Sequence, residues 1–267
     1  MIALGVNGAL GRMGNRILHL AQASQDFKIT GAFESPGNSS LGKDLGSLLG
    51  LNALLKVKLA ELSAGALKNC DVLIDFSSPE GAARCVELGV KSNTALVIGT
   101  TGIGETMGRL IKEASEKIAI LHSPNMSIGA NFLFQAAAFA ARNLKEGYDV
   151  EIVEAHHRLK KDAPSGTAKK LAEVIAKEKG WDLNQVARYG REGVTGERPK
   201  KEIGIHVVRA GEIVGEHTIL FSGPGETIEL THKAQTRDAF ARGALAAAFF
   251  LSKKKKGLYS MLDVINS

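Results

Sequence analysis

A single short stretch, residues 154–168, places side chains that transfer protons next to a turn that suits an anion. His156, His157 and Lys160 lie close together in the chain. Histidine exchanges protons near neutral pH, and a lysine pairs with carboxylates. Ser165 and Gly166 then lead into a helical segment, 168–179, whose first N–H groups and dipole favour negative charge. The stretch predicts a site that holds and protonates a small anion, and the alternative is an ordinary solvated loop.

The first half of the chain has the pattern of a fold that binds a dinucleotide. Residues 2–7 read as a buried strand, and the glycines of a G-x-x-G-x-x-G turn follow at Gly8, Gly11 and Gly14. A helical pattern begins at Met13 with apolar residues at steps of three and four. Glycines in this context let the backbone approach a pyrophosphate at the helix N-terminus. The predicted cofactor contacts in this turn are Gly8, Ala9, Leu10, Gly11, Arg12 and Met13.

Further strand ends complete the predicted cofactor site. Residues 27–33 read as a second strand, and Glu34 at its end lies 20 residues after Gly14, where an acid accepts ribose hydroxyls. Three more strands are predicted at 72–76, 95–98 and 119–121. Ligands of a doubly wound sheet bind at the carboxyl ends of its strands. The contacts predicted there are Gly99, Thr100, Thr101, Ser123, Pro124, Asn125 and Met126.

The second half of the chain predicts a different kind of sheet. Residues 150–156 alternate with period two and deliver His156 at their end. Strand patterns follow at 203–210, 213–221 and 226–232, separated by turns. We expect an α+β domain with a mostly antiparallel or mixed sheet. The helix at 168–179 is too small to cover both faces, and an uncovered sheet face commonly finds a partner subunit.

These motifs together resemble one family. The string E-A-H-H-R-x-K-x-D-A-P-S-G-T-A, residues 154–168, is similar to the signature of the 4-hydroxy-tetrahydrodipicolinate (dihydrodipicolinate) reductases, and the other motifs match in the same order. The resemblance implies reduction of 4-hydroxy-tetrahydrodipicolinate to tetrahydrodipicolinate by a nicotinamide hydride, in the diaminopimelate route to lysine. It implies His156 and Lys160 as the catalytic acid–base pair. The substrate contacts that it implies are His157, Ser165, Gly166 and Thr167.

The resemblance also implies the organisation of the chain. A Rossmann-like dinucleotide domain should span 1–127, with 237–267 packing back on it, and a substrate-binding and oligomerisation domain should span 128–236. It implies a homotetramer built through the second sheet. Family members often have an arginine after the acid at Glu34, whereas this chain has Ser35. We therefore predict that NADH is preferred and that NADPH is also used.

Composition limits the remaining possibilities. The 267 residues are 44% hydrophobic and carry a formal net charge of +6, of which the lysine run at 253–256 contributes four. We interpret this run as a solvated helix end and expect no nucleic acid partner. Cys70 and Cys85 cannot form a disulfide framework, and neither lies in a metal-ligand spacing, so we expect no metal. No secretory signal or run long enough to span a membrane is found, which predicts a cytoplasmic protein without a membrane partner.

Two other functions stay open at this level. An amino-acid dehydrogenase would share the architecture, but the histidine–lysine turn argues against it. A redox sensor that binds nucleotide and DNA would need a DNA-binding module, and nothing before the first strand could form one. A cofactor-oxidation assay with and without substrate separates the enzyme from the sensor.

Overall fold

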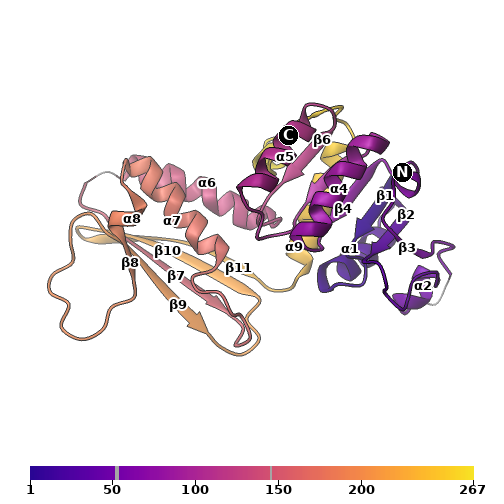
Figure 1. The fold of residues 1–267 in the computed structure, drawn as a ribbon. Coiled ribbons are helices and arrows are strands. Elements are labelled where there is room, and N and C mark those ends of the chain that lie inside the picture. The colour runs from indigo at the N-terminus through magenta and orange to yellow at the C-terminus, as the bar shows by residue number, and fades with distance from the viewer. Residues whose placement is uncertain (52–53, 145) are drawn as a thin grey trace. The chain divides into compact units, whose positions relative to one another are not determined.

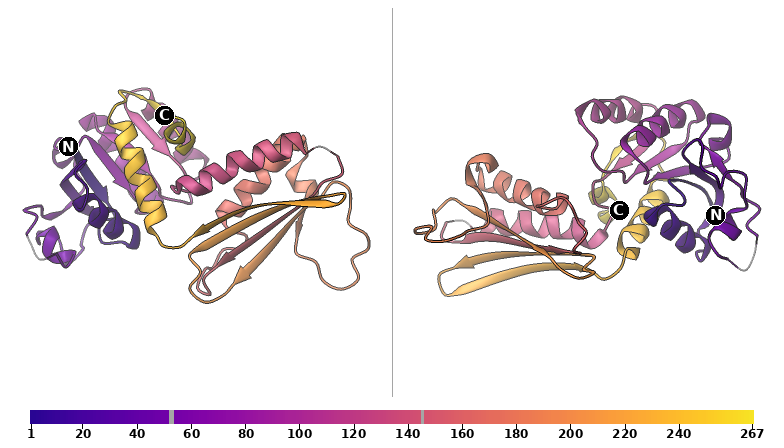
Figure 2. Two further views of the ribbon diagram at one scale, coloured as in Figure 1. Left: turned by 180° about the vertical axis from the view of Figure 1, so that it is seen from behind. Right: turned by 60° about the horizontal axis from the view of Figure 1, so that its bottom comes forward.

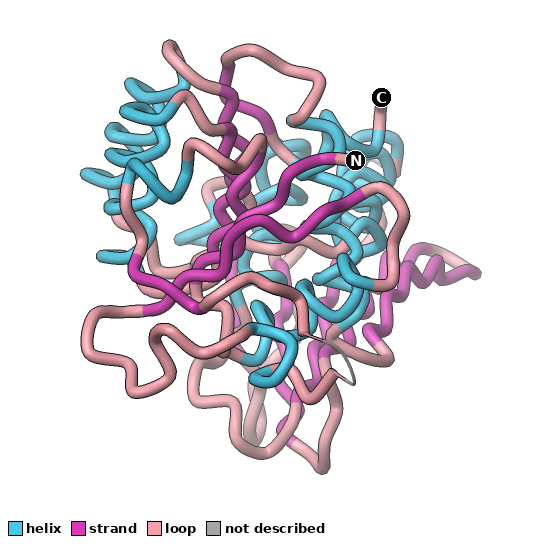
Figure 3. Tube along the Cα trace, turned by 90° about the vertical axis from the view of Figure 1, so that its right-hand side faces the viewer, coloured by secondary structure: helices cyan, strands magenta, loops and turns pink. Residues whose placement is uncertain are grey.

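A computed structural model describes residues 1–51, 54–144 and 146–267 of the protein (Figure 1). The chain divides into two compact units. The first contains Met1–Ile128 together with Arg237–Ser267, and the second contains Gly129–Thr236. Both chain ends therefore belong to the first unit, whose strands lie side by side in the view of Figure 3.

The first unit is built on a sheet of seven parallel strands in the order β12-β6-β5-β4-β1-β2-β3. From β1 the chain first adds β2 and β3 on one side and then β4, β5 and β6 on the other. Sheets of this kind bind ligands at the point where the direction of strand addition changes. Every predicted strand of this half is present. The bounds are β1 Ile2–Asn7, β2 Phe27–Glu34, β3 Leu59–Glu61, β4 Val72–Asp75, β5 Ala95–Ile98, β6 Ala119–His122 and β12 Gly257–Tyr259.

Helices cover both faces of this sheet (Figures 1 and 2). Strand β4 shows why, because Val72 and Ile74 pack into one core with α1 and α9, while Leu73 packs into another with α4 and α5. A strand buried on both faces reads as a continuous apolar run, as this one does. The helices are α1 Arg12–Gln22, α2 Leu45–Leu48, α3 Ala64–Leu67, α4 Pro79–Ser92, α5 Glu105–Ser115, α9 Asp238–Leu251 and α10 Met261–Ile265.

The second unit has a mixed sheet of five strands in the order β11-β10-β7-β9-β8. Its bounds are β7 Asp149–His156, β8 Ala187–Tyr189, β9 Ile203–Arg209, β10 Gly215–Gly223 and β11 Glu226–Ala234. Strands β7, β10 and β11 pair antiparallel, whereas β9 joins β7 and β8 in parallel. Antiparallel pairing is therefore less dominant than the strand patterns suggest. The reason is that the chain from β7 to β9 passes through helix α7, and a crossover returns the chain in the same direction.

Helices cover one face of the second sheet (Figure 2). Ile152, Ile205 and Phe221 of three neighbouring strands point into a core with the helices. The helices of this unit are α6 Ile128–Asn143, α7 Gly166–Lys179 and α8 Leu183–Val186. In the part of the chain that the structure describes, no helix is both long and apolar enough to cross a membrane.

Candidate active site

The glycine-rich turn after β1 is shaped by close backbone contacts. Gly8 has φ +74°, and a Cβ there would lie 2.5 Å from the carbonyl oxygen of Phe76. A Cβ on Gly14 would overlap the carbonyl of Gly8, so α1 can begin this close to the turn only with glycine at both positions. Gly11 is the N-cap of α1 and brings no side chain to its first turn. The turn thus presents backbone N–H groups and a positive dipole end to an anion, and it fits the pyrophosphate of a dinucleotide.

The acid at the end of β2 faces the same turn. Glu34 accepts hydrogen bonds from Leu10 N at 2.9 Å and from Ser35 N at 3.3 Å. A hollow of about 710 Å³ adjoins it and is lined by Gly8, Glu34 and Ser35 among others. Arg84 of α4 also lines this hollow. This cation could not be predicted from the sequence, because nothing in the spacing of α4 indicates that Arg84 shares a hollow with the end of β2.

A buried carboxylate joins three loops at this edge of the sheet. Asp75, at the end of β4, accepts from Asn7 Nδ2 at 2.7 Å, from Ser77 Oγ at 2.6 Å and from Thr100 Oγ1 at 2.6 Å. The side chain of Thr100, a predicted cofactor contact, is thereby bound to the protein. The hydroxyl of Thr100 braces the loop after β5 through this bond.

The remaining predicted cofactor contacts lie at the same edge. Ser123 Oγ donates to the carbonyl of Asn125 at 2.7 Å, and Asn125 Oδ1 accepts from Ser127 N at 2.8 Å, which shapes the loop after β6. The side chain of Met126 is buried in the core with α9, so only its backbone can face a ligand. Ala9 is buried, Leu10 and Met13 are half-buried, and the exposed positions are Gly11, Arg12, Thr101 and Pro124.

In the second unit, β7 delivers His156 to the edge of the sheet. The ring is 12% exposed, and its Nδ1 hydrogen-bonds to Oε2 of Glu154 at 2.6 Å. Burial lowers the pKa of His156, and the hydrogen bond to Glu154 opposes this effect. A second buried histidine, His217 of β10, lies edge-on to the ring with 5.2 Å between centroids.

Lys160 is held by its neighbour in the same loop. Its Nζ donates to Oδ1 of Asp162 at 2.8 Å, and this bond lowers the pKa of Asp162. From the sequence, Asp162 could orient Lys160 or cap the turn, and the structure shows the bond to Lys160. The N-cap of α7 is Ser165, and Asp162 orients Lys160 instead.

The hydrogen-bonding groups of Ser165, in the turn before α7, are used mostly by other residues of the protein. Ser165 is 2% exposed, its Oγ accepts from Ala168 N at 3.2 Å, and the same oxygen contacts Nε2 of His217 at 2.9 Å. A hydrogen bond that this hydroxyl donated to a substrate would compete with its contact to His217. Gly166 and Thr167 form the first turn of the helix, where backbone N–H groups suit a carboxylate. His157 is half-buried, and its Nδ1 has no hydrogen-bond partner among the described residues.

Three side chains of this site, those of Glu154, Arg209 and His217, are not indicated by the sequence motifs. Glu154 lies inside the stretch 154–168, but nothing in that stretch shows what its carboxylate binds. Arg209 and His217 come from β9 and β10, more than 50 residues further along the chain. Strand alternation puts Glu154 on the face of β7 that carries the buried Ile152, and a buried acid on a core face signals a partner. Which partner it finds depends on the strand order.

Known proteins resemble this chain along its full length. Family models described as "Dihydrodipicolinate reductase, N-terminus" and "Dihydrodipicolinate reductase, C-terminus" match residues 2–126 and 129–265. Proteins named 4-hydroxy-tetrahydrodipicolinate reductase are 47% identical in Anaeromyxobacter sp., over 99% of this chain and 98% of the relative, and 48% identical in Nitrosomonas europaea, over 98% and 97%.

Solved structures agree with this assignment. A dipicolinate-bound dihydrodipicolinate reductase from Paenisporosarcina sp. TG-14 has a TM-score of 0.76 at 26% identity, over 98% of this chain and 99% of its own. An amine dehydrogenase from Mycobacterium smegmatis has a TM-score of 0.60 at 13% identity, over 97% of this chain and 95% of its own, and shares the fold alone. The family predicted from the signature at 154–168 is confirmed, and the protein belongs to the dihydrodipicolinate reductases.

Proposed function

We propose that the protein reduces 4-hydroxy-tetrahydrodipicolinate to tetrahydrodipicolinate with a nicotinamide hydride, in the diaminopimelate route to lysine. One observation carries the proposal. In a chain 47% identical to relatives of that name, His156 and Lys160 lie next to the N-terminus of α7 and are held there by carboxylates. This arrangement suits a small dicarboxylate that must be bound and protonated. The related reductase from Paenisporosarcina was solved with a dicarboxylate, dipicolinate, bound.

The residues of the second unit take separate roles in this proposal. The first turn of α7, at Gly166 and Thr167, binds one substrate carboxylate through backbone N–H groups. His157 contacts the substrate, and Ser165 supports the turn through its cap. His156 and Lys160 form the catalytic pair, in which the exchangeable proton of His156 is at Nε2, because Nδ1 is committed to Glu154. A bound nicotinamide cofactor supplies the hydride.

The first unit is the cofactor domain in this proposal, and NADH is preferred. Glu34 lies where it accepts ribose hydroxyls, and its negative charge repels a 2′-phosphate. Ser35 offers no cation to that phosphate, but Arg84 lines the same hollow. NADPH is therefore used as well, less efficiently than NADH.

We further propose a cytoplasmic homotetramer assembled through the second sheet. The support is that helices cover only one face of that sheet in the described residues (Figure 2). A sheet face without helices commonly packs against another subunit. Sedimentation of the full-length protein at micromolar concentration tests this, and a monomer there would refute the oligomer.

The decisive experiment follows oxidation of NADH by the purified protein with and without enzymatically generated 4-hydroxy-tetrahydrodipicolinate. We expect oxidation only when the substrate is present, and tetrahydrodipicolinate as the product. The matched control replaces the substrate with small 2-oxo acids and ammonia, which an amino-acid dehydrogenase would use. Turnover with those compounds, or none with either, would reject the proposed reaction.

A further inference from the structure

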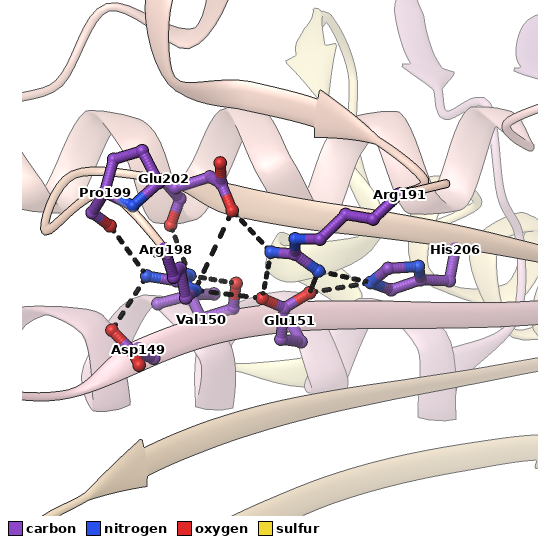
Figure 4. Close-up of polar contacts among 8 residues, drawn as sticks. All are labelled: Asp149, Val150, Glu151, Arg191, Arg198, Pro199, Glu202 and His206. Atoms are coloured by element: carbon purple, nitrogen blue, oxygen red, sulfur yellow. Dashed lines mark hydrogen bonds and ion pairs between the residues drawn. The ribbon is translucent and has the colours of Figure 1, made fainter. Parts of the chain in front are cut away.

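Strand β7 carries two glutamates, each bound by an arginine and a histidine, on its opposite faces. Glu154 points to the helix-covered face, where it meets Arg209 and His156. Glu151 points to the other face and meets Arg191, Arg198 and His206, as Figure 4 shows. Both carboxylates accept from arginine and histidine, but only the first cluster includes a histidine of the proposed active site. Glu151 therefore serves as a comparison for Glu154.

Each oxygen of the Glu154 carboxylate accepts two hydrogen bonds. Oε1 accepts from Ser165 N at 2.9 Å and from Arg209 Nη2 at 2.9 Å. Oε2 accepts from His156 Nδ1 at 2.6 Å and from Arg209 Nη1 at 2.8 Å. The side chain of Glu154 is completely buried. A group that takes two donors on each oxygen cannot be replaced by an amide without losing at least one of them.

These contacts fix the chemistry of His156. A carboxylate only accepts, so His156 must carry its proton on Nδ1, and Nε2 is left to exchange protons. The neighbouring strand also limits the orientation of the ring. Nε2 of His156 lies so close to Gly215 that a Cβ added to this glycine would be 3.1 Å from Nε2. His217 cannot take over the role of Glu154. Its Nε2 is already engaged with the hydroxyl of Ser165 at 2.9 Å.

The same carboxylate connects the other parts of the site. Through Ser165 N it holds the turn that begins α7. Arg209 binds Glu154 through both of its terminal nitrogens, Nη1 and Nη2. Its Nη2 also donates to the carbonyl of Asp162 at 2.7 Å. The side chain of Asp162 in turn holds Lys160. One buried acid is thus linked to both members of the proposed catalytic pair and to the anion-binding turn.

We propose that Glu154 is a positioning residue. It fixes the protonation site and the orientation of His156, and through Arg209 and Asp162 it holds Lys160 in position relative to that histidine. The inference rests on the proposed function and deepens it, because it names the group that prepares the acid–base pair. Glu154 itself touches neither substrate nor cofactor in this proposal.

The charges around His156 determine how the loss of Glu154 or of Arg209 should change the pKa of this histidine. The groups that face the ring are Glu154 on its own strand, Lys160 in the next loop, Arg209 on β9 and His217 on β10. Glu154 raises the pKa of His156, while burial, Lys160 and Arg209 lower it. Removing the carboxylate therefore lowers the pKa of His156 further, and removing Arg209 raises it. A merely structural defect would not move the two variants in opposite directions.

The test compares Glu154→Gln, Arg209→Gln and the control Glu151→Gln. Nuclear magnetic resonance of 15N-labelled histidine reports the tautomer and titration of His156 without substrate, and His156→Gln identifies its signals. We expect an Nδ1-protonated ring in the wild type, a mixed tautomer titrating at lower pH in Glu154→Gln, and a titration at higher pH in Arg209→Gln. Glu151→Gln should match the wild type.

Steady-state kinetics supply the second readout. In Glu154→Gln we expect kcat to fall on the order of 100-fold, the lower end of what an acid–base group supplies, with the NADH dissociation constant unchanged. An unchanged tautomer and pH profile in Glu154→Gln, or an equal change in Glu151→Gln, would overturn the inference. If Glu154→Gln does not fold, the direction of the shift in Arg209→Gln decides. A wild type with an Nδ1-protonated His156 but no turnover would reject the proposed function and leave the positioning role intact.

Discussion

At the scale of single residues, the proposed catalytic groups are distinct from the groups that hold them. Among the described residues, His156 pairs with the carboxylate of Glu154 and Lys160 with that of Asp162. The catalytic pair can be proposed from the sequence because its members lie four residues apart in the chain. Their holders could not be predicted in full, since Arg209 joins them only after β9 has paired with β7.

The first prediction concerns the two reactive residues. His156→Ala and Lys160→Ala should each lower kcat about 100- to 10,000-fold, the range that general acid–base groups supply. Their affinity for NADH should remain, because both lie in the second unit and the glycine turn lies in the first. Steady-state kinetics and nucleotide titration check both statements. Near wild-type turnover in either variant would remove that residue from the catalytic pair.

A second prediction concerns the choice of cofactor. Ser35→Arg should raise kcat/KM with NADPH, because charge-assisted bonds to a phosphate are roughly twice as strong as neutral ones. The wild type should prefer NADH. The comparison variant is Arg84→Ala, which removes the cation that already lines the hollow and should reduce the use of NADPH. A wild-type preference for NADPH, or no gain from Ser35→Arg, would show that this loop does not set the choice.

At the scale of elements, the strongest sequence patterns mark the elements that position the site. Strands β1, β5 and β7 were predicted to within one residue, because continuous or alternating apolar runs are local signals. Strands β3, β8 and β12 were missed. Each has three residues, which are too few to show an alternating pattern of apolar and polar side chains. Each forms because it pairs with the edge of a longer neighbouring strand.

The third prediction tests the junction of β1, its turn and α1. Gly14→Ala should abolish most nucleotide binding, because the added Cβ would overlap the carbonyl of Gly8 and push the helix away from the turn. Gly108→Ala in α5 is the matched control, since a Cβ there meets nothing within 4 Å. The control should be neutral or stabilising by about 0.5–1 kcal/mol. Thermal unfolding and NADH titration measure both, and normal NADH affinity in Gly14→Ala would contradict the proposed pyrophosphate site.

At the scale of the whole molecule, buried ionisable groups set the response to acid. Burial lowers the pKa of His217 to about 3. Burial would raise the pKa of Glu154, but its bonds to Arg209, His156 and Ser165 outweigh that and hold it at about 2. Both shifts make the folded state less stable in acid than at neutral pH. The histidine contribution is lost as the pH falls below about 6.5, and the glutamate contribution is lost below about 4.5.

The fourth prediction isolates the histidine part. Between about pH 6.5 and 3 the unfolded chain binds a proton at His217 that the folded chain does not, so stability falls by about 1.4 kcal/mol for each unit of acidification. His217→Gln keeps an acceptor for Ser165 and removes this titration. Its unfolding temperature should vary less than that of the wild type from pH 6.5 to 5. The same slope in both proteins would show that His217 is not the buried neutral group.

The first unit is interrupted in the sequence by the second, and this affects the order in which the protein can form during synthesis. Helix α9 supplies much of one face of the first core, where Ala244, Ala248 and Leu251 pack with Leu4 and Val6 of β1. The ribosome makes Gly129–Thr236 before it makes α9. The second unit therefore leaves the ribosome complete while the first sheet still has an open apolar face. For that interval, the nascent chain exposes the type of surface that chaperones bind.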